Sequence, residues 1–328
     1  MSDLCMIGMD VGGTSTRALI ATLDGSCLGV GRAAGGNPTS HGGARAGEQI
    51  AIALRGALAA VDPTRVRAGV IGLAGAGRLL ADPASRAAVD AAWRDAGLAC
   101  PYEVVGDALV AFAAGTAAAA GTVLIAGTGA IAASVRGHRL DRIADGHGWL
   151  LGDAGSGFWI GREAVRHALA TLDAARSPDV LTRAVIRFLL DTAAVADRPR
   201  DTVDALVQRA TAGPPVELAA LAPLVISGYA EREPAAVGIL DRAASHLVHT
   251  VGVVRAPGAD SPIVLAGGLL TVGTPLATAV SAELAARWPA ASRSVAKDGA
   301  AAAAWLAACT LSDVDAAAAA DLHRALLP

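Results

Sequence analysis

The sequence of 328 residues has very little lysine and few aromatic side chains. Only Lys297 among its 27 basic residues is a lysine, and aromatic residues make up 3% of the chain. A phosphate-binding loop of the G-x-x-x-x-G-K-[ST] type needs a lysine beside its glycines, so this class of nucleotide site is excluded. The lysine arrangement of the protein kinases is excluded for the same reason. A net charge of −3 gives no sign of the basic patch that marks nucleic-acid-binding proteins.

Cysteine pairs and long apolar helices are also missing. The four cysteines, Cys5, Cys27, Cys100 and Cys309, form no C-x-x-C pair, which argues against a zinc ribbon and a dithiol redox motif. With no signal peptide in view, we expect a reduced, cytoplasmic protein. The uncharged segment 108–135 is long enough to span a bilayer, but glycines interrupt it, so we expect no membrane span.

Glycine, in contrast, is abundant, and the first glycine-rich turn follows an acidic residue. Asp10 ends an apolar run that predicts a strand at 4–9, and a second strand is predicted at 15–22. The residues that connect them are Gly12, Gly13, Thr14 and Ser15. Successive backbone N–H groups in such a turn make an anion site, to which the hydroxyl groups add donors. An aspartate beside phosphate needs a cation between them, so we predict that Asp10 anchors hydrated Mg²⁺ on a bound nucleotide.

The same pattern returns in residues 122–146, which predict a strand, a glycine turn, a strand, a hairpin and a strand. Gly127, Thr128 and Gly129 form the turn of this second copy. Internal repetition of this kind predicts two similar halves. We place the first domain at 1–118 and a larger second domain, with a helical insertion, at 119–328.

Two segments fit a dinucleotide-binding pattern, G-x-G-x-x-A, namely 29–34 and 127–132. A dinucleotide fingerprint opens a helix, whereas hairpin strands adjoin both of these segments. We interpret both as chance matches.

The motifs together resemble the superfamily that unites sugar kinases, actin and the heat-shock chaperone ATPases. "GMDVGGTSTRALI" resembles its first phosphate motif, "VLIAGTGAIA" the second and "IVLAGGLL" the adenosine motif. "GNPTSHG", "VVGDALVAF" and "GWLLGDAGSGFWIGREA" resemble sugar-side segments of the BadF/BadG/BcrA/BcrD group, which includes N-acetylglucosamine kinases. The resemblance implies an α/β fold of two RNase H-like domains, of the actin and hexokinase type, with a central cleft and often a homodimeric state.

The resemblance also implies roles for single residues. Asp107 matches the catalytic aspartate, which would accept the proton of the sugar 6-hydroxyl as that oxygen attacks the γ-phosphate of ATP. Taken by itself, without the resemblance, Asp107 is better interpreted as a helix N-cap. The nucleotide would be bound by the residues of both glycine turns and by Gly267 and Gly268. The sugar-side candidates are Asn37, Asp107, His147, Gly148 and Asp153, although His147 could also be a packed loop residue.

Two departures from the family pattern are visible. Ala154 stands where the group often has an acid, "GDEGS", which leaves sugar contacts or the metal environment open. The Cys/His zinc cluster of the ROK-type sugar kinases is absent, which argues against that branch. His246 and His249 are spaced for a metal, but a half-exposed helix face is the better interpretation.

The sequence therefore predicts an ATP- and Mg²⁺-dependent kinase of an amino sugar, N-acetylglucosamine first and glucosamine next. We expect a small-molecule partner, no nucleic acid and no membrane. The alternative is an ATPase activator of a 2-hydroxyacyl-CoA dehydratase or benzoyl-CoA reductase system. Such an activator holds an iron–sulfur cluster between subunits, yet no cysteine here lies in a glycine-rich loop. A regulator that binds sugar without turnover is a third possibility. The sequence does not favour it, because no helix-turn-helix extension precedes residue 4.

Overall fold

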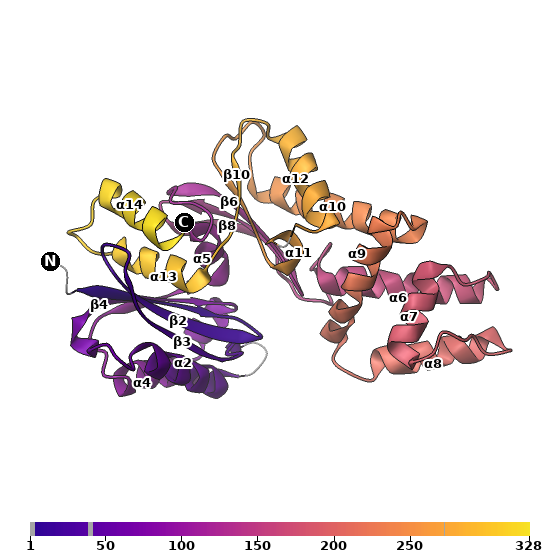
Figure 1. Cartoon of the computed structure of the whole chain (residues 1–328), viewed down its shortest axis with the longest axis horizontal. Helices are drawn as coiled ribbons and strands as arrows, with labels where there is room; N and C mark the ends of the chain where they lie inside the picture. The colour runs from indigo at the N-terminus through magenta and orange to yellow at the C-terminus, as the bar shows by residue number, and fades with distance from the viewer. Residues whose placement is uncertain (1–3, 39–41, 272) are drawn as a thin grey trace. The chain divides into compact units, whose positions relative to one another are not determined.

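The computed structural model describes residues 4–38, 42–271 and 273–328 (Figure 1). Two five-stranded sheets organise it, with strand orders β3-β2-β1-β4-β5 and β10-β9-β6-β7-β8. The strands of the first sheet are β1 (Cys5–Val11), β2 (Ser15–Thr22), β3 (Cys27–Ala34), β4 (Val66–Leu73) and β5 (Tyr102–Gly106). Those of the second are β6 (Ala120–Ala126), β7 (Ala130–Arg136), β8 (Arg139–Asp145), β9 (Ile263–Ala266) and β10 (Arg293–Val295).

The two sheets share one topology. In each, three strands consecutive in the chain lie side by side, and the fourth and fifth strands are added beyond the first of them. This confirms the prediction of an α/β fold in two similar halves. The two dinucleotide-like segments are also confirmed as chance matches, because 29–34 lies inside β3 and 127–132 runs into β7 rather than into a helix.

Strand direction in the first sheet decides where its loops gather. β1 pairs with β2 antiparallel, whereas β1 with β4 and β4 with β5 are parallel pairs. The carboxyl ends of three strands therefore meet at one edge of the sheet, the edge at which ligands bind in many α/β folds.

Helices cover both faces of the first sheet. On one face, α2 (Gly43–Ala57) and α4 (Pro83–Asp95) enclose a core that includes Ile7, Met9 and Ile50. On the other face lies α13 (Gly299–Ala308), which comes so close that a Cβ at Gly8 would stand 2.0 Å from the nitrogen of Ala304. The alanine-rich sequence of α13 thus serves close packing, because larger side chains could not enter this contact.

The shorter elements complete the first half. They are η1 (Pro63–Arg65), α3 (Ala76–Ala81), α5 (Asp107–Ala113) and α14 (Ala316–Leu326). The indole N–H of Trp305, on α13, donates to the oxygen of Ala319 over 2.7 Å and so attaches α14.

Helices make up most of the second half, in agreement with the helical insertion predicted for the second domain. They are α6 (Gly157–Asp173), α7 (Val180–Leu190), α8 (Pro199–Thr211), η2 (Pro215–Leu221), α9 (Ala222–Ala230), α10 (Pro234–Val254), α11 (Gly268–Thr271) and α12 (Pro275–Arg287). Ser177-Pro178 lies between α6 and α7, Gly213-Pro214 lies between α8 and η2, and Pro215 begins η2. Buried side chains of α10, among them Ile239, Leu240 and Leu247, belong to the core of this half.

Internal packing divides the chain into two units that are not continuous in sequence. One comprises Met1–Val123, Val135–Asp141 and Ser294–Pro328, and the other Leu124–Ser134 and Arg142–Arg293. We refer to them as unit 1 and unit 2. These units are defined by internal contacts and are discontinuous, so they do not test the domain boundary predicted at residue 118. That boundary stays a prediction.

The uncharged segment 108–135 folds as parts of α5, β6 and β7, so it is not a membrane helix. Within the described ranges, no single helix has both the length and the apolar character needed to cross a bilayer. Only the bent pair Pro199–Thr211 and Pro215–Ala230 meets the criterion, by length and composition alone.

Candidate functional site

The first glycine turn joins β1 to β2 in unit 1 and leaves its backbone open. The N–H of Gly12 donates to the oxygen of Ser15 over 2.9 Å, which closes the turn. Gly13, Thr14 and Ser15 are exposed, and a Cβ placed on Gly13 would meet nothing within 4 Å. Their backbone N–H groups and hydroxyls are thus presented together on one tight, open turn.

The loop that carries Asn37 packs against this turn. Gly36 donates its N–H to the oxygen of Gly12 over 3.1 Å, and a Cβ at Gly35 would lie 2.0 Å from the oxygen of Gly13. The structure therefore brings Asn37, a predicted sugar ligand, beside the predicted phosphate turn. The rest of that predicted segment, at 39–41, lies outside the described residues.

Two carboxylates meet at the carboxyl edge of the first sheet. Asp10 stands near the end of β1, and Asp107 begins α5 directly after β5. Burial raises the pKa of Asp10 to about 6, Arg17 opposes the rise, and the negative charges of Asp107 and Asp298 add to it. Burial also raises the pKa of Asp107, against which the N–H groups of Ala108 and of Asp107 itself act. Buried like charges favour a cation between them.

Three residues near Asp10 were not predicted as part of the site. Arg17 lies directly opposite Asp10 in the β1–β2 pair, and its Nη1 is 3.2 Å from Oδ2 of Asp298. Gly299 lies against Asp10, since a Cβ there would be 2.5 Å from the Asp10 carboxylate. The sequence shows here only an aspartate and a glycine before an alanine-rich run, which does not indicate contact with the other end of the chain.

The single lysine is not at the turn. The Nζ atom of Lys297 donates to the oxygen of Leu327 over 3.1 Å and to that of Pro328. The lysine is therefore engaged with the C-terminal residues, and Arg17 is the cationic side chain that the structure places opposite Asp10.

The second glycine turn joins β6 to β7 in unit 2 and is held by a helix. Gly127 donates its N–H to the oxygen of Gly129 over 2.9 Å. At the start of α6, Gly157 donates to the oxygen of Gly127 over 2.8 Å and Phe158 to that of Thr128 over 3.2 Å. The helix thus occupies the carbonyl groups of the turn.

The two glycines of the predicted adenosine motif lie beside this second turn. Gly267 has a φ of 86°, and a Cβ there would be 2.3 Å from the oxygen of Ala126, the last residue of β6. Gly268 is exposed and has open space where a Cβ would be. The structure therefore gathers Gly127, Thr128, Gly129, Gly267 and Gly268 in one part of unit 2.

The loop between β8 and α6 adds a buried carboxylate. Asp153 adopts a φ of 58°, and its Oδ1 accepts the N–H of Ala130, the residue after the second turn, over 3.0 Å. Burial raises the pKa of Asp153, and this hydrogen bond opposes the rise. His147 is exposed in the same loop, and Gly148 has a φ of 84°.

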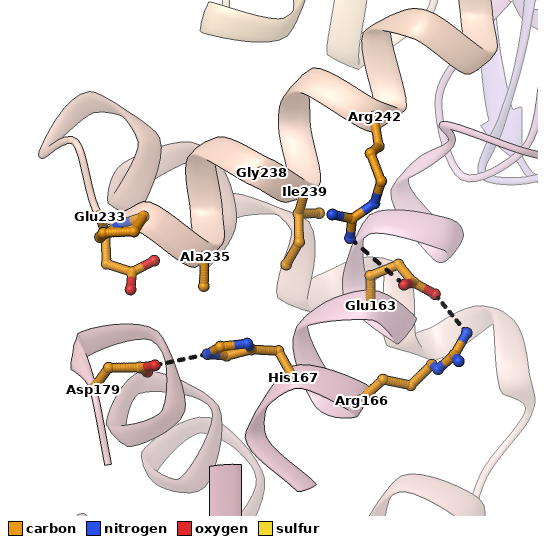
Figure 2. Close-up of a pocket in the computed structure, with 10 residues that line it drawn as sticks. Glu163, Arg166, His167, Asp179, Glu233, Ala235, Gly238, Ile239 and Arg242 are labelled. Carbon is orange, nitrogen blue, oxygen red and sulfur yellow. Dashed lines mark hydrogen bonds and ion pairs between the residues drawn. The ribbon is translucent and has the colours of Figure 1, made fainter. Parts of the chain in front are cut away.

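A separate cavity of about 610 Å³ lies among α6, α7 and α10 (Figure 2). None of the predicted site residues lines it. Its charged groups already face one another: Nε2 of His167 is 2.7 Å from Oδ2 of Asp179, and Glu163 lies between Arg166 and Arg242. Glu233, which also lines the cavity, accepts the N–H of Ala236 over 2.6 Å.

No group of three or more His, Cys, Asp or Glu side chains in the described part of the chain could hold a metal ion. His246 and His249 are both exposed on α10, as expected for an outer helix face. The magnesium site predicted at Asp10 is of a different kind, because Mg²⁺ keeps several waters and needs only one or two carboxylates beside the phosphates.

Comparison with known proteins gives the fold and the family. A structure titled "Putative N-acetylglucosamine Kinase" from Chromobacterium violaceum matches with a TM-score of 0.69 and 23% identity, over 93% of this chain and 99% of that one. One of the same description from Porphyromonas gingivalis matches with a TM-score of 0.62 and 20% identity, over 90% and 95%. A ROK family glucokinase from Streptomyces griseus, in complex with glucose and AMPPNP, gives 0.55 and 20%, over 93% and 99%.

These identities establish a shared fold, which is that of two-domain sugar kinases. None of the curated proteins matches the sequence. The BadF/BadG/BcrA/BcrD ATPase family matches residues 7–304, nearly the whole chain. The protein with the two glycine turns and the Asp10–Asp107 pair therefore belongs to the BadF/BadG/BcrA/BcrD ATPase family.

Proposed function

We propose that this protein is an ATP-dependent kinase that phosphorylates the 6-hydroxyl of an amino sugar, N-acetylglucosamine in the first place and glucosamine next. The observation that supports it most is the meeting of Asp10 and Asp107 at one edge of the first sheet, beside an open glycine turn. A second carboxylate at this edge could accept the proton of an alcohol that attacks the γ-phosphate.

The donor set of the first turn fits a magnesium–nucleotide. Exposed N–H groups and hydroxyls at Gly13, Thr14 and Ser15 would bind phosphate oxygens. Asp10 would hold the ion through its carboxylate. Mg²⁺, when bound, neutralises negative charge on the phosphates. A Cβ on Gly13 would meet nothing within 4 Å, so phosphate oxygens can approach the backbone of the turn there.

Asp107 would act as the general base. Its carboxylate accepts the proton of the 6-hydroxyl as the sugar oxygen bonds to the γ-phosphorus and the bond to the β–γ bridging oxygen breaks, which releases ADP. Burial raises its pKa and so makes it a stronger base than a free aspartate. The first helical N–H groups of α5 favour its ionised form between turnovers.

The second unit would supply the other contacts. Gly127, Thr128 and Gly129 would bind the γ-phosphate, and Gly267 and Gly268 the adenosine. Asn37 in unit 1, and His147, Gly148 and Asp153 in unit 2, would bind sugar hydroxyls or the substituent at C2. The homodimeric state remains a prediction from the family resemblance, and the cytoplasmic location remains a prediction from the cysteine content and the lack of a signal peptide.

No observation favours the activator alternative. An iron–sulfur cluster between subunits needs accessible thiols. Cys5 is buried in β1, Cys100 and Cys309 are half-buried, and Cys27 is exposed on β3.

An ADP-release assay across N-acetylglucosamine, glucosamine, N-acetylmannosamine, muramic acid and glucose tests the proposal. We expect turnover to depend on the sugar, to be greatest with N-acetylglucosamine, and to yield a 6-phosphate that ³¹P NMR identifies. ADP release that is equally fast without any sugar would overturn the proposal. An absorbance band of an iron–sulfur cluster in the purified protein would favour the activator.

A further inference from the structure

Asp145 belongs to none of the motifs, yet it makes a two-pronged contact with the loop that follows it. The residue ends β8. Its Oδ1 accepts the N–H of Asp153 over 2.7 Å, and its Oδ2 accepts the N–H of Ala154 over 3.1 Å. Hydrogen bonds to an ionised acceptor are stronger than those between neutral groups. One carboxylate thus holds two successive backbone groups at the far end of the loop.

The backbone of this loop is unusual and needs such a restraint. Asp145 and Asp153 adopt φ values of 63° and 58°, and Gly146, Gly148 and Gly155 are also left-handed. Non-glycine residues keep this conformation only where the surrounding structure holds them. The space around the Asp145 carboxylate is full, since a Cβ at Gly152 would lie 2.1 Å from its Oδ1.

The same loop is fastened to the second glycine turn. Gly146 donates its N–H to the oxygen of Ala130 over 2.9 Å, and Oδ1 of Asp153 accepts the N–H of Ala130 over 3.0 Å. Both backbone groups of Ala130, the residue after Gly129, are therefore bound by the loop. Asp145 precedes Gly146, which makes the first of these contacts, and it binds the backbone N–H of Asp153, which makes the second.

We infer that Asp145 is a positioning residue, which sets the place of Asp153 and ties the sugar-side loop to the second phosphate turn. The inference rests on the proposed function, in which Asp153 binds a sugar hydroxyl. Its contact with the substrate is indirect, since its two oxygens face backbone N–H groups. A misplaced Asp153 would weaken sugar binding while the nucleotide contacts in unit 1 stay intact.

The test compares Asp145→Asn and Asp145→Ala with Asp141→Asn. Asp141 lies on the same strand, and its Oδ2 is 3.6 Å from Nη2 of Arg136, away from the loop. The asparagine keeps one acceptor oxygen and the alanine keeps none. We expect KM for the sugar to rise about 30-fold in Asp145→Ala, equivalent to about 2 kcal/mol, and less in Asp145→Asn. The kcat value and KM for ATP should change less than about 3-fold.

Hydrogen exchange of the Asp153 and Ala154 amides gives a readout that does not depend on activity. Both amides should exchange faster in Asp145→Ala and stay protected in Asp141→Asn. An unchanged sugar KM in both Asp145 variants, or an equal rise for sugar and ATP, would overturn the inference. If the unmodified protein phosphorylates no sugar, the proposed function fails. Unchanged exchange of both amides in Asp145→Ala would by itself refute the role of Asp145 in holding the Asp153 and Ala154 backbone. Should Asp145→Ala not fold, the same comparisons apply to Asp145→Asn.

Discussion

The two glycine turns occupy the same place in two sheets of the same strand order, but different contacts hold them. The turn after β1 is backed by a loop, through the bond from Gly36 to Gly12, and it has Asp10 two residues before its first glycine. The turn after β6 is backed by the start of α6, and Ile125 stands in the position that corresponds to Asp10. Duplication has therefore kept the backbone of the turn and placed the carboxylate in one copy.

This difference has a chemical meaning. A magnesium–nucleotide needs an anchor for the ion and several neutral donors for the phosphates. The first turn has Asp10 two residues before its first glycine, whereas the carboxylate beside the second turn, that of Asp153, comes from the loop before α6 and accepts the N–H of Ala130. Each of the following predictions tests whether the two turns divide the work in this way.

The largest effect is expected at Asp107, the charged partner of Asp10. Asp107→Asn removes the proton acceptor and should lower kcat by about 10²–10⁴-fold. The affinity for an ATP analogue, measured by calorimetry, should change less than about 3-fold. Asp95→Asn, an exposed aspartate at the end of α4, is the matched control and should keep full turnover. Normal turnover in Asp107→Asn would remove this residue from the reaction.

The ionised carboxylate of Asp10 should lower the stability of the folded protein while it is required for turnover. Its pKa rises from the ordinary value of 3.8 to about 6 on folding, so the folded state binds more protons than the unfolded state in this window. Stability from this group is therefore present below about pH 4 and is lost as the pH rises towards 6. Asp10→Asn should abolish turnover and raise the free energy of unfolding at pH 8 by at most about 3 kcal/mol.

Urea denaturation at pH 8 and at pH 4 measures this effect, with little gain expected at pH 4. A variant that is less stable than the parent at pH 8 would show that the carboxylate is well paired in the folded protein. In that case, the presence of Asp10 at the first turn would not need a bound cation to explain it.

The open space at the two turns predicts matched losses of nucleotide affinity. Gly13→Ala and Gly127→Ala each add a methyl group where nothing lies within 4 Å, so the fold should tolerate both. Each methyl group would stand where phosphate has to approach the backbone, and the Kd for an ATP analogue should rise about 10-fold, equivalent to about 1.4 kcal/mol. Gly77→Ala on α3, which also has open space, is the control. A loss in only one of the two turns would show that the other does not touch the nucleotide.

The smallest effect is expected at Lys297. Its ammonium group is engaged with the C-terminal residues, so Lys297→Met should change the Kd for the nucleotide less than 2-fold. The melting temperature should fall slightly, because the hydrogen bonds of Nζ to the backbone oxygens of Leu327 and Pro328 are lost and a hydrogen bond contributes about 0.5–1.5 kcal/mol. A loss of nucleotide affinity above about 10-fold would mean that the lysine leaves the C-terminus when ATP binds.

Local patterns allowed much of the fold to be predicted. The strand–turn–strand repeats around Asp10 and Thr128 predicted two similar halves, because period and turn chemistry are encoded within a few residues. The candidate residues of each unit also gather in the structure, with Asn37 and Asp107 near the first turn and Gly267 and Asp153 near the second.

The remaining features depend on contacts that leave no local pattern. Arg17 and Asp298 meet although most of the chain separates them, and a cross-strand register cannot be read from either residue alone. Asp145 binds backbone N–H groups, which every residue type other than proline carries, so its partners have no signature in the sequence. The same holds for the close approach of Gly8 to α13.

The position of α13 has a consequence for how the protein is made. The ribosome delivers the strands of the first sheet early, but the helix that covers the Gly8 face is among the last segments to emerge (Figure 1). Until then, α5 covers only part of this face, through Val110 against Gly72, and the apolar surface that remains is a natural target for chaperones. A chain that stops before residue 299 should consequently aggregate even though every strand of its first sheet has been synthesised.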